Sequence, residues 1–258
     1  MIEARSLTKR FASGSGVSDL DFSVARGELF VFLGPNGAGK STTVKMLIGL
    51  LDPDSGSARI AGFDSVGERL SVKLSIGYMA ERPYLYEKLT AREYVTFVAD
   101  VFAVPATLRR ARMGELFAAF EIDDAADRLI ETFSHGMRQK TALAAVLVHE
   151  PRVLFLDEPT NGLDPRSARI VKDILRDICD RGATVFMTTH VLEIAEQMCS
   201  RVAILDHGRL IAIGTMDDLR VETGLAIGTL EDIYLALTGA AEMPTLSLYA
   251  GAGTGPVN

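Results

Sequence analysis

The chain has 258 residues, of which 48% are hydrophobic, so it can bury one large core or a core with a subdomain. Its apolar runs fall well short of the ~18 residues that a membrane-spanning helix needs, so no membrane span is expected. The formal net charge of −7 argues against broad binding to nucleic acid, and no nucleic-acid partner is expected.

A phosphate-binding motif follows the first predicted strands. Residues 1–33 alternate short β-like runs with turns, and the last run, 28–33, has the composition of a buried strand. The next nine residues match the P-loop pattern G-x-x-x-x-G-K-[ST], and they are Gly34, Pro35, Asn36, Gly37, Ala38, Gly39, Lys40, Ser41 and Thr42. A helix is predicted to begin near Gly39 and extend to Leu50. This strand–loop–helix context favours a P-loop over a glycine-rich surface turn.

Each part of this loop has a physical task in holding a nucleoside triphosphate. The glycines allow the backbone to curl so that successive N–H groups point at phosphate oxygens, and the helix adds its positive dipole end. Lys40 is expected to reach the β- and γ-phosphates, and the Ser41 hydroxyl to bind Mg²⁺. The sequence therefore predicts a site for a nucleoside triphosphate with Mg²⁺.

The chain changes from β-like to helical composition near Pro83. Before this point, the segments 57–61 and 74–79 are strand candidates. After it, apolar residues recur at helical spacing, so residues 84–150 are predicted to be mostly helical.

Two helix starts can be located in this helical part. Thr90 and Glu93 match a capping box, which predicts that a helix begins there. Pro105 is expected to end this helix, because proline has no backbone N–H to continue it. Thr107 is then expected to cap the next helix, which runs to about Phe120.

Two further strands carry ionisable side chains to one edge of the predicted sheet. The buried run 153–156 ends in Asp157 and Glu158, and His190 follows the strand 184–188. Strands that alternate with helices indicate a mostly parallel sheet. Because the P-loop strand ends at the same carboxyl edge, these side chains are expected to meet the nucleotide there.

The three side chains suit different parts of phosphate chemistry. Asp157 is expected to bind Mg²⁺, and Glu158, on the other side of the strand, to orient or deprotonate an attacking water. His190 is suited to hydrogen-bond the γ-phosphate or the water. Acidic residues that merely end a strand and a structural histidine are the simpler alternatives, and the P-loop upstream argues against them. The expected catalytic residues are Glu158, His190 and Lys40.

Residues 133–140 resemble the signature segment of ATP-binding cassette (ABC) proteins, whose common form is LSGGQ followed by basic and glutamine residues. Ser134 and Gly136 match this form, whereas Phe133, His135 and Met137 depart from it. With these departures the segment resembles that of the ATP-binding subunits of type-2 ABC exporters. Ser134 is placed to cap a helix whose free N–H groups can meet an anion.

Other motifs of the family follow in order, and the resemblance covers about residues 2–238. Residues 161–165 resemble the D-loop, His190 matches the switch histidine, and Phe11 matches the aromatic residue that stacks on adenine. A core position remains the alternative for Phe11. The resemblance implies ATP as the nucleotide and adds to the nucleotide-binding residues Phe11, Ser134, Gly136 and Asp164.

The fold that the resemblance implies is α/β. It has a RecA-like P-loop NTPase core with a mostly parallel sheet, an N-terminal antiparallel β-subdomain and an inserted α-helical subdomain. The expected limits are a single domain over 1–238, with its core in 1–83 and 151–220, its helical subdomain in 84–150 and a C-terminal helix at about 228–238. Residues 239–258 are expected to be a disordered tail.

The loop that joins the core to the helical subdomain departs from the family. Glu81 stands where the family usually has glutamine. A carboxylate is a hard oxygen ligand for Mg²⁺, although it adds negative charge near the γ-phosphate. Some type-2 exporter subunits are similar here, so Glu81 is not interpreted as inactivating. The expected metal ligands are Ser41, Glu81 and Asp157.

The resemblance also implies two protein partners. In this family two ATPase subunits meet head to tail, so Ser134 and Gly136 are expected to cover the nucleotide of a second, identical subunit. A separate membrane permease docks beside the Glu81 loop, where residues 83–86 form an apolar, aromatic cluster. Packing within the helical subdomain is the alternative for this cluster.

The implied function is an ATP-binding, ATP-hydrolysing subunit that powers export through the permease. The expected location is the cytoplasm, at the inner face of the cell membrane. One alternative is a soluble ABC ATPase that acts on ribosomes or DNA, which the single P-loop and the acidic charge disfavour. Another is a nucleotide sensor without hydrolysis, which the complete set of Lys40, Asp157, Glu158 and His190 disfavours.

Overall fold

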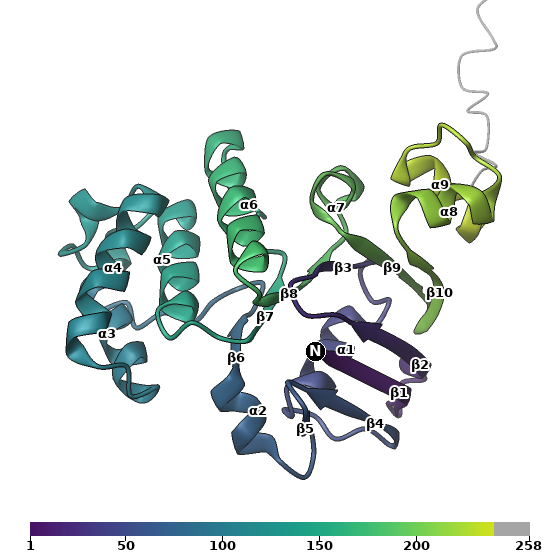
Figure 1. Ribbon diagram of the computed structural model, residues 1–258, viewed down its shortest axis with the longest axis horizontal. Coiled ribbons are helices and arrows are strands. Elements are labelled where there is room, and N and C mark those ends of the chain that lie inside the picture. The colour runs from purple at the N-terminus through teal and green to yellow at the C-terminus, as the bar shows by residue number, and fades with distance from the viewer. Residues whose placement is uncertain (240–258) are drawn as a thin grey trace, which may run out of the picture.

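The strands form two sheets. The structure is a computed structural model that describes residues 1–239, and within them there is a six-stranded and a four-stranded sheet (Figure 1). The larger sheet has the order β10-β9-β3-β8-β7-β6, with β3 (Leu29–Leu33), β6 (Ile76–Met79), β7 (Val153–Asp157), β8 (Thr184–Thr189), β9 (Arg201–Asp206) and β10 (Arg209–Gly214). Its strands from β9 to β6 pair in parallel, and β10 pairs antiparallel with β9. The mostly parallel sheet is therefore confirmed.

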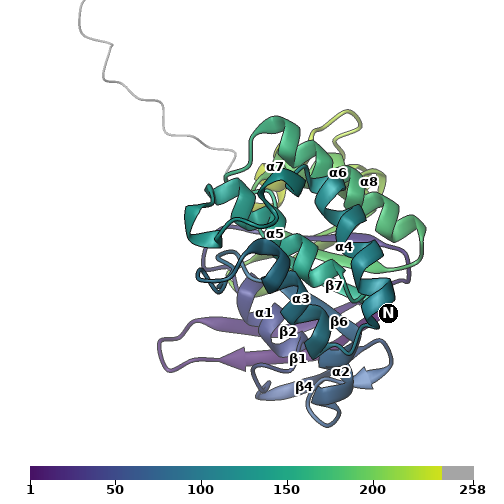
Figure 2. The same cartoon turned by 90° about the vertical axis from the view of Figure 1, so that its left-hand side faces the viewer.

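The smaller sheet is antiparallel and lies on one side of the larger one (Figure 2). It has the order β2-β1-β4-β5, with β1 (Ile2–Arg10), β2 (Gly16–Val24), β4 (Ser55–Ile60) and β5 (Phe63–Asp64). Helix α1 (Lys40–Leu47) contacts β2 and β4 and shares their hydrophobic core. This arrangement confirms the N-terminal antiparallel subdomain.

Alternating residues of β3 belong to two separate cores. Phe30 and Phe32 face the antiparallel sheet, where the ring centroid of Phe22 lies 6.0 and 5.7 Å from theirs. Val31 and Leu33 pack in the core on the helical side. A parallel strand buried on both faces reads as a continuous apolar run. The end of β3, where the P-loop begins, is thus fixed from both sides.

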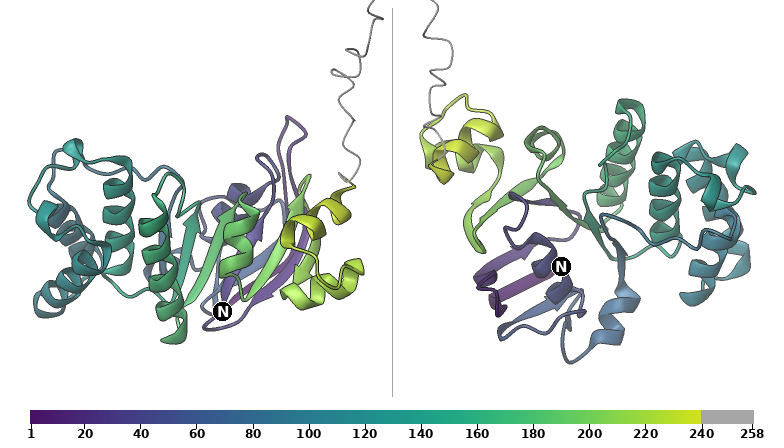
Figure 3. Two further views of the ribbon diagram at one scale, coloured as in Figure 1. Left: turned by 90° about the horizontal axis from the view of Figure 1, so that it is seen from above. Right: turned by 180° about the vertical axis from the view of Figure 1, so that it is seen from behind.

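Helices cover the other side of the larger sheet and both ends of the molecule (Figures 1 and 3). Helices α6 (Pro165–Asp180) and α7 (Leu192–Met198) lie on that side, whereas α2 (Arg69–Ser75) contacts β5 and β6 and packs Val72 into the core of the antiparallel sheet. One end holds α3 (Ala91–Val101), α4 (Ala106–Phe120), α5 (His135–Leu147) and the 3₁₀ turns η1 (Asp123–Ala125) and η2 (Ile130–Thr132). The other end holds α8 (Met216–Thr223) and α9 (Leu230–Thr238). Among residues 1–239 no helix has the length and apolar character to cross a bilayer.

The helical subdomain confirms one predicted helix start and corrects another. Thr90 Oγ1 accepts a hydrogen bond from Glu93 N at 3.1 Å, and the Glu93 carboxylate accepts one from Thr90 N at 2.8 Å, so the capping box is formed. The predicted cap at Thr107 is wrong. Helix α4 begins at Ala106 with Pro105 at its N-cap, because the fixed φ of proline fits a helix start and no N–H is lost there.

Other boundaries also differ from the sequence predictions. The strand expected from residue 74 begins at Ile76, because residues 69–75 form α2. Helix α1 ends at Leu47 rather than Leu50, since Gly49 has a left-handed φ of 70° that breaks the helix. The tail predicted for 239–258 lies outside the described residues from 240 onward. The proposed domain limits stay a prediction.

The partly buried His149 makes folding stability depend on pH. Its ring stacks on Phe102 with centroids 3.7 Å apart, and its Nε2 hydrogen-bonds Ile76 O at 3.1 Å. Burial lowers the pKa of His149, the hydrogen bond to Ile76 opposes this, and the Arg112 cation lowers the pKa further. Because the unfolded chain then binds a proton more readily, stability is complete above the unfolded pKa of about 6.5 and is lost as the pH falls below it.

We therefore expect His149→Gln to weaken the loss of stability below about pH 6.5. One proton contributes a slope of at most about 1.4 kcal/mol per pH unit. The check is the urea unfolding free energy at neutral and at mildly acidic pH, with His207→Gln as the matched control because the His207 side chain is 95% exposed. An identical pH slope in His149→Gln and wild type would show that His149 does not contribute.

Candidate functional site

The P-loop connects β3 to α1 and needs glycine at positions where other atoms come close. A Cβ added to Gly34 would lie 2.3 Å from Leu205 O, and one added to Gly39 would lie 2.3 Å from Val17 Cγ1. Gly39 also has a φ of 108°, which side chains rarely allow. The loop can therefore take its curled form only with glycine at these two positions.

Lys40, the first residue of α1, lies buried under the loop. Its Nζ donates hydrogen bonds to Gly34 O at 2.6 Å and to Pro35 O at 3.1 Å. Burial lowers the pKa of Lys40, and the charges of Glu158, Asp157 and Glu81 oppose that shift. An ammonium group has three N–H donors, so two are used on the loop and the third is left for a ligand oxygen.

Ser41 and Asp157 bring oxygen atoms together beside Lys40. Ser41 Oγ donates to Asp157 Oδ2 at 3.1 Å, and Thr188 Oγ1 bonds the other carboxylate oxygen of the buried Asp157. Glu81 lines the same cavity. Hydroxyl and carboxylate oxygens are the ligands that Mg²⁺ prefers, so this donor set fits it.

The same region contains few protein ligands for a metal. Across residues 1–239, no three His, Cys, Asp or Glu side chains come together as a metal-binding group. Mg²⁺ is usually bound through one or two carboxylates together with water and substrate phosphates. The donor set at Ser41 and Asp157 therefore suits a metal ion that arrives with a nucleotide.

Glu158 does not follow the alternation predicted for a strand. Strand β7 ends at Asp157, and Glu158 has a left-handed φ of 50°, so both carboxylates line one cavity instead of opposite faces. Thr189 Oγ1 donates to Glu158 Oε2 at 2.9 Å, and His190 Nδ1 lies 2.6 Å from Glu158 Oε1. Both oxygens of this buried carboxylate are thus held by residues at the end of β8.

A cavity of about 270 Å³ at the carboxyl edge of the sheet is lined by Lys40, Asp157 and Glu158. His190 contacts Glu158 and is not among the residues that line the cavity. Phe11 lies at its rim and is 40% exposed, so the alternative of a core position for Phe11 is wrong. The sequence analysis did not single out Ser15 and Gly16, which also line the cavity. The lining consists of Phe11, Ser15, Gly16, Asn36, Gly37, Gly39, Lys40, Ser41, Thr42, Glu81, Asp157 and Glu158.

Six of the predicted nucleotide-binding residues are absent from this lining. Gly34, Pro35 and Ala38 lie within the P-loop, and the other three lie on other elements. Ser134 is the N-cap of α5 and accepts a hydrogen bond from Met137 N at 3.3 Å, and Gly136 follows in the first turn. Asp164 is the N-cap of α6, and its hydrogen bonds from Ser167 lower the pKa of the Asp164 carboxyl. Each has a local structural task, and none of the three belongs to the lining of the cavity within its own chain.

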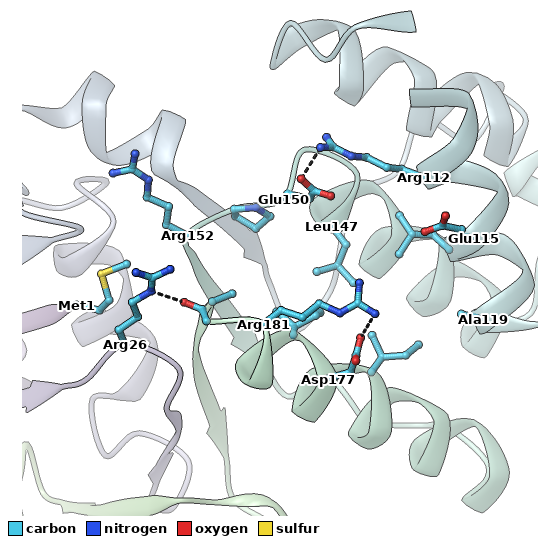
Figure 4. A pocket seen from close by; sticks show the side chains of 16 residues that line it. Met1, Arg26, Arg112, Glu115, Ala119, Leu147, Glu150, Arg152, Asp177 and Arg181 are labelled. Atoms are coloured by element: carbon cyan, nitrogen blue, oxygen red, sulfur yellow. Dashed lines mark hydrogen bonds and ion pairs between the residues drawn. The ribbon is translucent and has the colours of Figure 1, made fainter. Parts of the chain in front are cut away.

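A larger cavity, of about 760 Å³, lies at the opposite edge of the sheet, before β7 and β8 (Figure 4). Two pairs of its charged side chains form ion pairs, Arg112 with Glu150 and Arg181 with Asp177. Arg26 donates to the Gly182 carbonyl at 3.1 Å. Ligands of parallel sheets bind beyond the carboxyl ends of the strands. The smaller cavity at the P-loop is therefore the candidate site.

Known proteins with similar sequences and structures point to one family. The family model described as "ABC transporter" matches residues 17–161. The daunorubicin resistance ATP-binding protein DrrA3 of Streptomyces coeruleorubidus is 43% identical over 84% of this chain and 68% of its own length. A fluoroquinolones export ATP-binding protein of Mycobacterium tuberculosis is 41% identical over 86% of this chain and 73% of its own. A solved structure of the ATP-binding subunit of an ABC transporter superposes with a TM-score of 0.88, at 32% identity, over 92% of this chain and 99% of that one.

Proposed function

The chain belongs to the ABC transporter family, and from this premise we propose that it hydrolyses ATP to drive export through a separate membrane permease. The observation that carries the proposal is the position of Glu158. Its buried carboxylate lines the P-loop cavity and is held on both oxygens by Thr189 and His190. A carboxylate fixed beside a phosphate site can orient a water molecule and accept its proton.

Nucleotide binding is assigned to the P-loop and the groups around it. The backbone N–H groups of the loop and Lys40 would hold the phosphates, and Phe11 at the rim would stack on the adenine ring. Mg²⁺ would be held by Ser41 and Asp157 with Glu81 beside them, and when bound it supplies positive charge to the phosphate oxygens. These groups would position the phosphates and neutralise their negative charge, which is most of what phosphoryl transfer requires.

Hydrolysis is assigned to Glu158 together with His190. With its Nδ1–H donated to Glu158, the imidazole of His190 has Nε2 left to accept a hydrogen bond from the attacking water. Glu158 would take the proton of the attacking water, and Lys40 would stabilise the charge on the transferred phosphate. The three residues act from the ends of neighbouring elements, β7, β8 and α1.

A second copy of the chain would complete the site. Ser134 and Gly136 lie at the positive end of α5 and do not line the cavity of their own chain, and Asp164 likewise lies outside it. Free N–H groups at a helix start attract phosphate. We propose that they cover the nucleotide bound by an identical partner, so that ATP joins two copies head to tail and hydrolysis releases them.

The contact with the permease is proposed at the loop after β6. Tyr84 is 98% exposed, an unusual state for an aromatic ring, which suits a protein contact. The Tyr86 ring packs edge-on against Tyr94 and Phe97 of α3 and is still 59% exposed, so internal packing accounts for only part of its surface. Docking there would hold the chain at the cytoplasmic face of the membrane. The relatives named for drug resistance and fluoroquinolone export support an exporter.

Phosphate release by the complex with its permease tests this function. The chain is co-expressed with a candidate membrane permease, purified with it in lipid, and assayed for phosphate release from ATP. We expect release with Mg²⁺ and its loss on adding EDTA, because the site supplies too few protein ligands to retain the metal without phosphate. ATP binding without any phosphate release would instead favour a nucleotide sensor.

A further inference from the structure

The start of α5 is hydrogen-bonded to the loop that follows β7 in the same chain. Gln139, in the second turn of α5, is only 1% exposed, and its Nε2 donates to Pro159 O at 3.1 Å and to Glu158 O at 3.5 Å. Its Oε1 is buried and accepts no hydrogen bond from residues 1–239. The side-chain amide of Gln139 is therefore held only by the hydrogen bonds that its NH2 group donates.

His135 makes a second connection to the same loop. Its Nε2 lies 3.2 Å from Asn161 O, which fits a donated hydrogen bond, because a carbonyl can only accept. A Cβ added to Gly162 would lie 2.7 Å from His135 Cδ2, so the ring is packed directly on this glycine. At this position the chain departs from the glycine of the common signature, and the structure gives the imidazole a defined contact.

The loop that receives both contacts carries Glu158 in an unfavourable backbone conformation. Non-glycine residues rarely adopt a φ of 50°, and they remain there only where their surroundings fix them. Glu158 N donates to Thr188 O at 3.1 Å, and Gln139 engages the carbonyl on the other side of the residue. The position of the Glu158 carboxylate therefore depends in part on α5.

We propose that Gln139 and His135 are positioning residues that couple the signature segment to Glu158 of the same chain. The inference rests on the proposed function, in which Ser134 covers the nucleotide of the second copy while Glu158 acts on its own. When the start of α5 engages a phosphate on the partner, Gln139 and His135 transmit its position to the β7–α6 loop. Each ATP site then adjusts the water-positioning carboxylate of the other.

The first test replaces Gln139 with methionine, which keeps the length of the side chain and removes the donors. In the permease complex we expect kcat to fall about tenfold with KM for ATP unchanged, because small misplacements of a reacting group are costly. The Hill coefficient for ATP should fall towards 1, since the two sites lose their connection. Hydrogen–deuterium exchange of residues 158–162 should increase without a matching change in residues 34–42.

Variants of His135 separate the hydrogen bond from simple packing. His135→Gln keeps an N–H donor and should retain most of the Hill coefficient, whereas His135→Phe keeps a ring without the donor and should lose it. Gln197→Met, on the exposed face of α7, is the matched control and should behave as wild type.

The outcomes distinguish this inference from the function on which it rests. If Gln139→Met has the same kcat, Hill coefficient and hydrogen–deuterium exchange as wild type, the coupling is overturned. The proposal that the chain hydrolyses ATP would still stand. A wild-type complex that binds ATP and releases no phosphate would overturn the proposed function and the coupling with it.

Discussion

Replacing Glu158 with glutamine is expected to lower ATP turnover at least a hundredfold, the smaller end of what a positioned general base contributes. The amide keeps the shape of the side chain and can still accept from Thr189 Oγ1, so the loop should keep its conformation. It cannot accept the proton of a water molecule. Lys40, Ser41 and Asp157 are untouched, so ATP binding should remain within a few-fold of wild type.

The same variant should also hold two copies of the chain together. If hydrolysis releases the head-to-tail pair, a chain that binds ATP and cannot hydrolyse it should accumulate as a dimer with ATP and Mg²⁺. Light scattering after size exclusion measures this, and phosphate release measures turnover. Glu193→Gln, an exposed carboxylate on α7, is the control and should remain active. Turnover by Glu158→Gln at the wild-type rate would contradict the assignment of Glu158.

Sequence patterns predicted which side chains meet at the candidate site, because this site is built from strand ends and one local motif. The P-loop is continuous in the sequence, and an apolar run that ends in Asp157 or Thr189 identifies the edge to which its side chains are carried. Parallel pairing of β3, β8 and β7 then brings these ends together without further information. Such contacts follow from topology and can be predicted from one sequence.

The details that the sequence did not reveal come from contacts between distant segments. The left-handed φ of Glu158 breaks the alternation of a strand, and nothing in the local sequence indicates it. The bonds from Gln139 to the β7–α6 loop require α5 to pack there. Helix α2 was missed for another reason. Leu70 and Leu74 are 71% and 57% exposed, and only Val72 is buried. The apolar residues of this helix therefore do not recur at helical spacing.

Replacing Lys40 with methionine should lower ATP affinity by about tenfold to a hundredfold, in line with a lost hydrogen bond to a charged group. Methionine fills a similar volume and removes the ammonium that would contact the β- and γ-phosphates. The variant also frees the carbonyls of Gly34 and Pro35, so the loop loses two bonds that shape it. Isothermal titration with ATP and Mg²⁺ measures the affinity, and hydrolysis should fall with it.

Thermal stability provides a second measurement of the Lys40 variant that separates binding from folding. ATP at a hundred times its Kd stabilises the wild-type chain by about 2.7 kcal/mol, and a hundredfold weaker site would gain only about 0.4 kcal/mol at the same concentration. Lys45→Met, on the exposed side of the same helix, is the control and should keep the full gain. If ATP stabilised Lys40→Met as much as the wild-type chain, the Lys40 ammonium would not contact the phosphates. Lys40 would then have a purely structural role, through its hydrogen bonds to the two carbonyls of the loop.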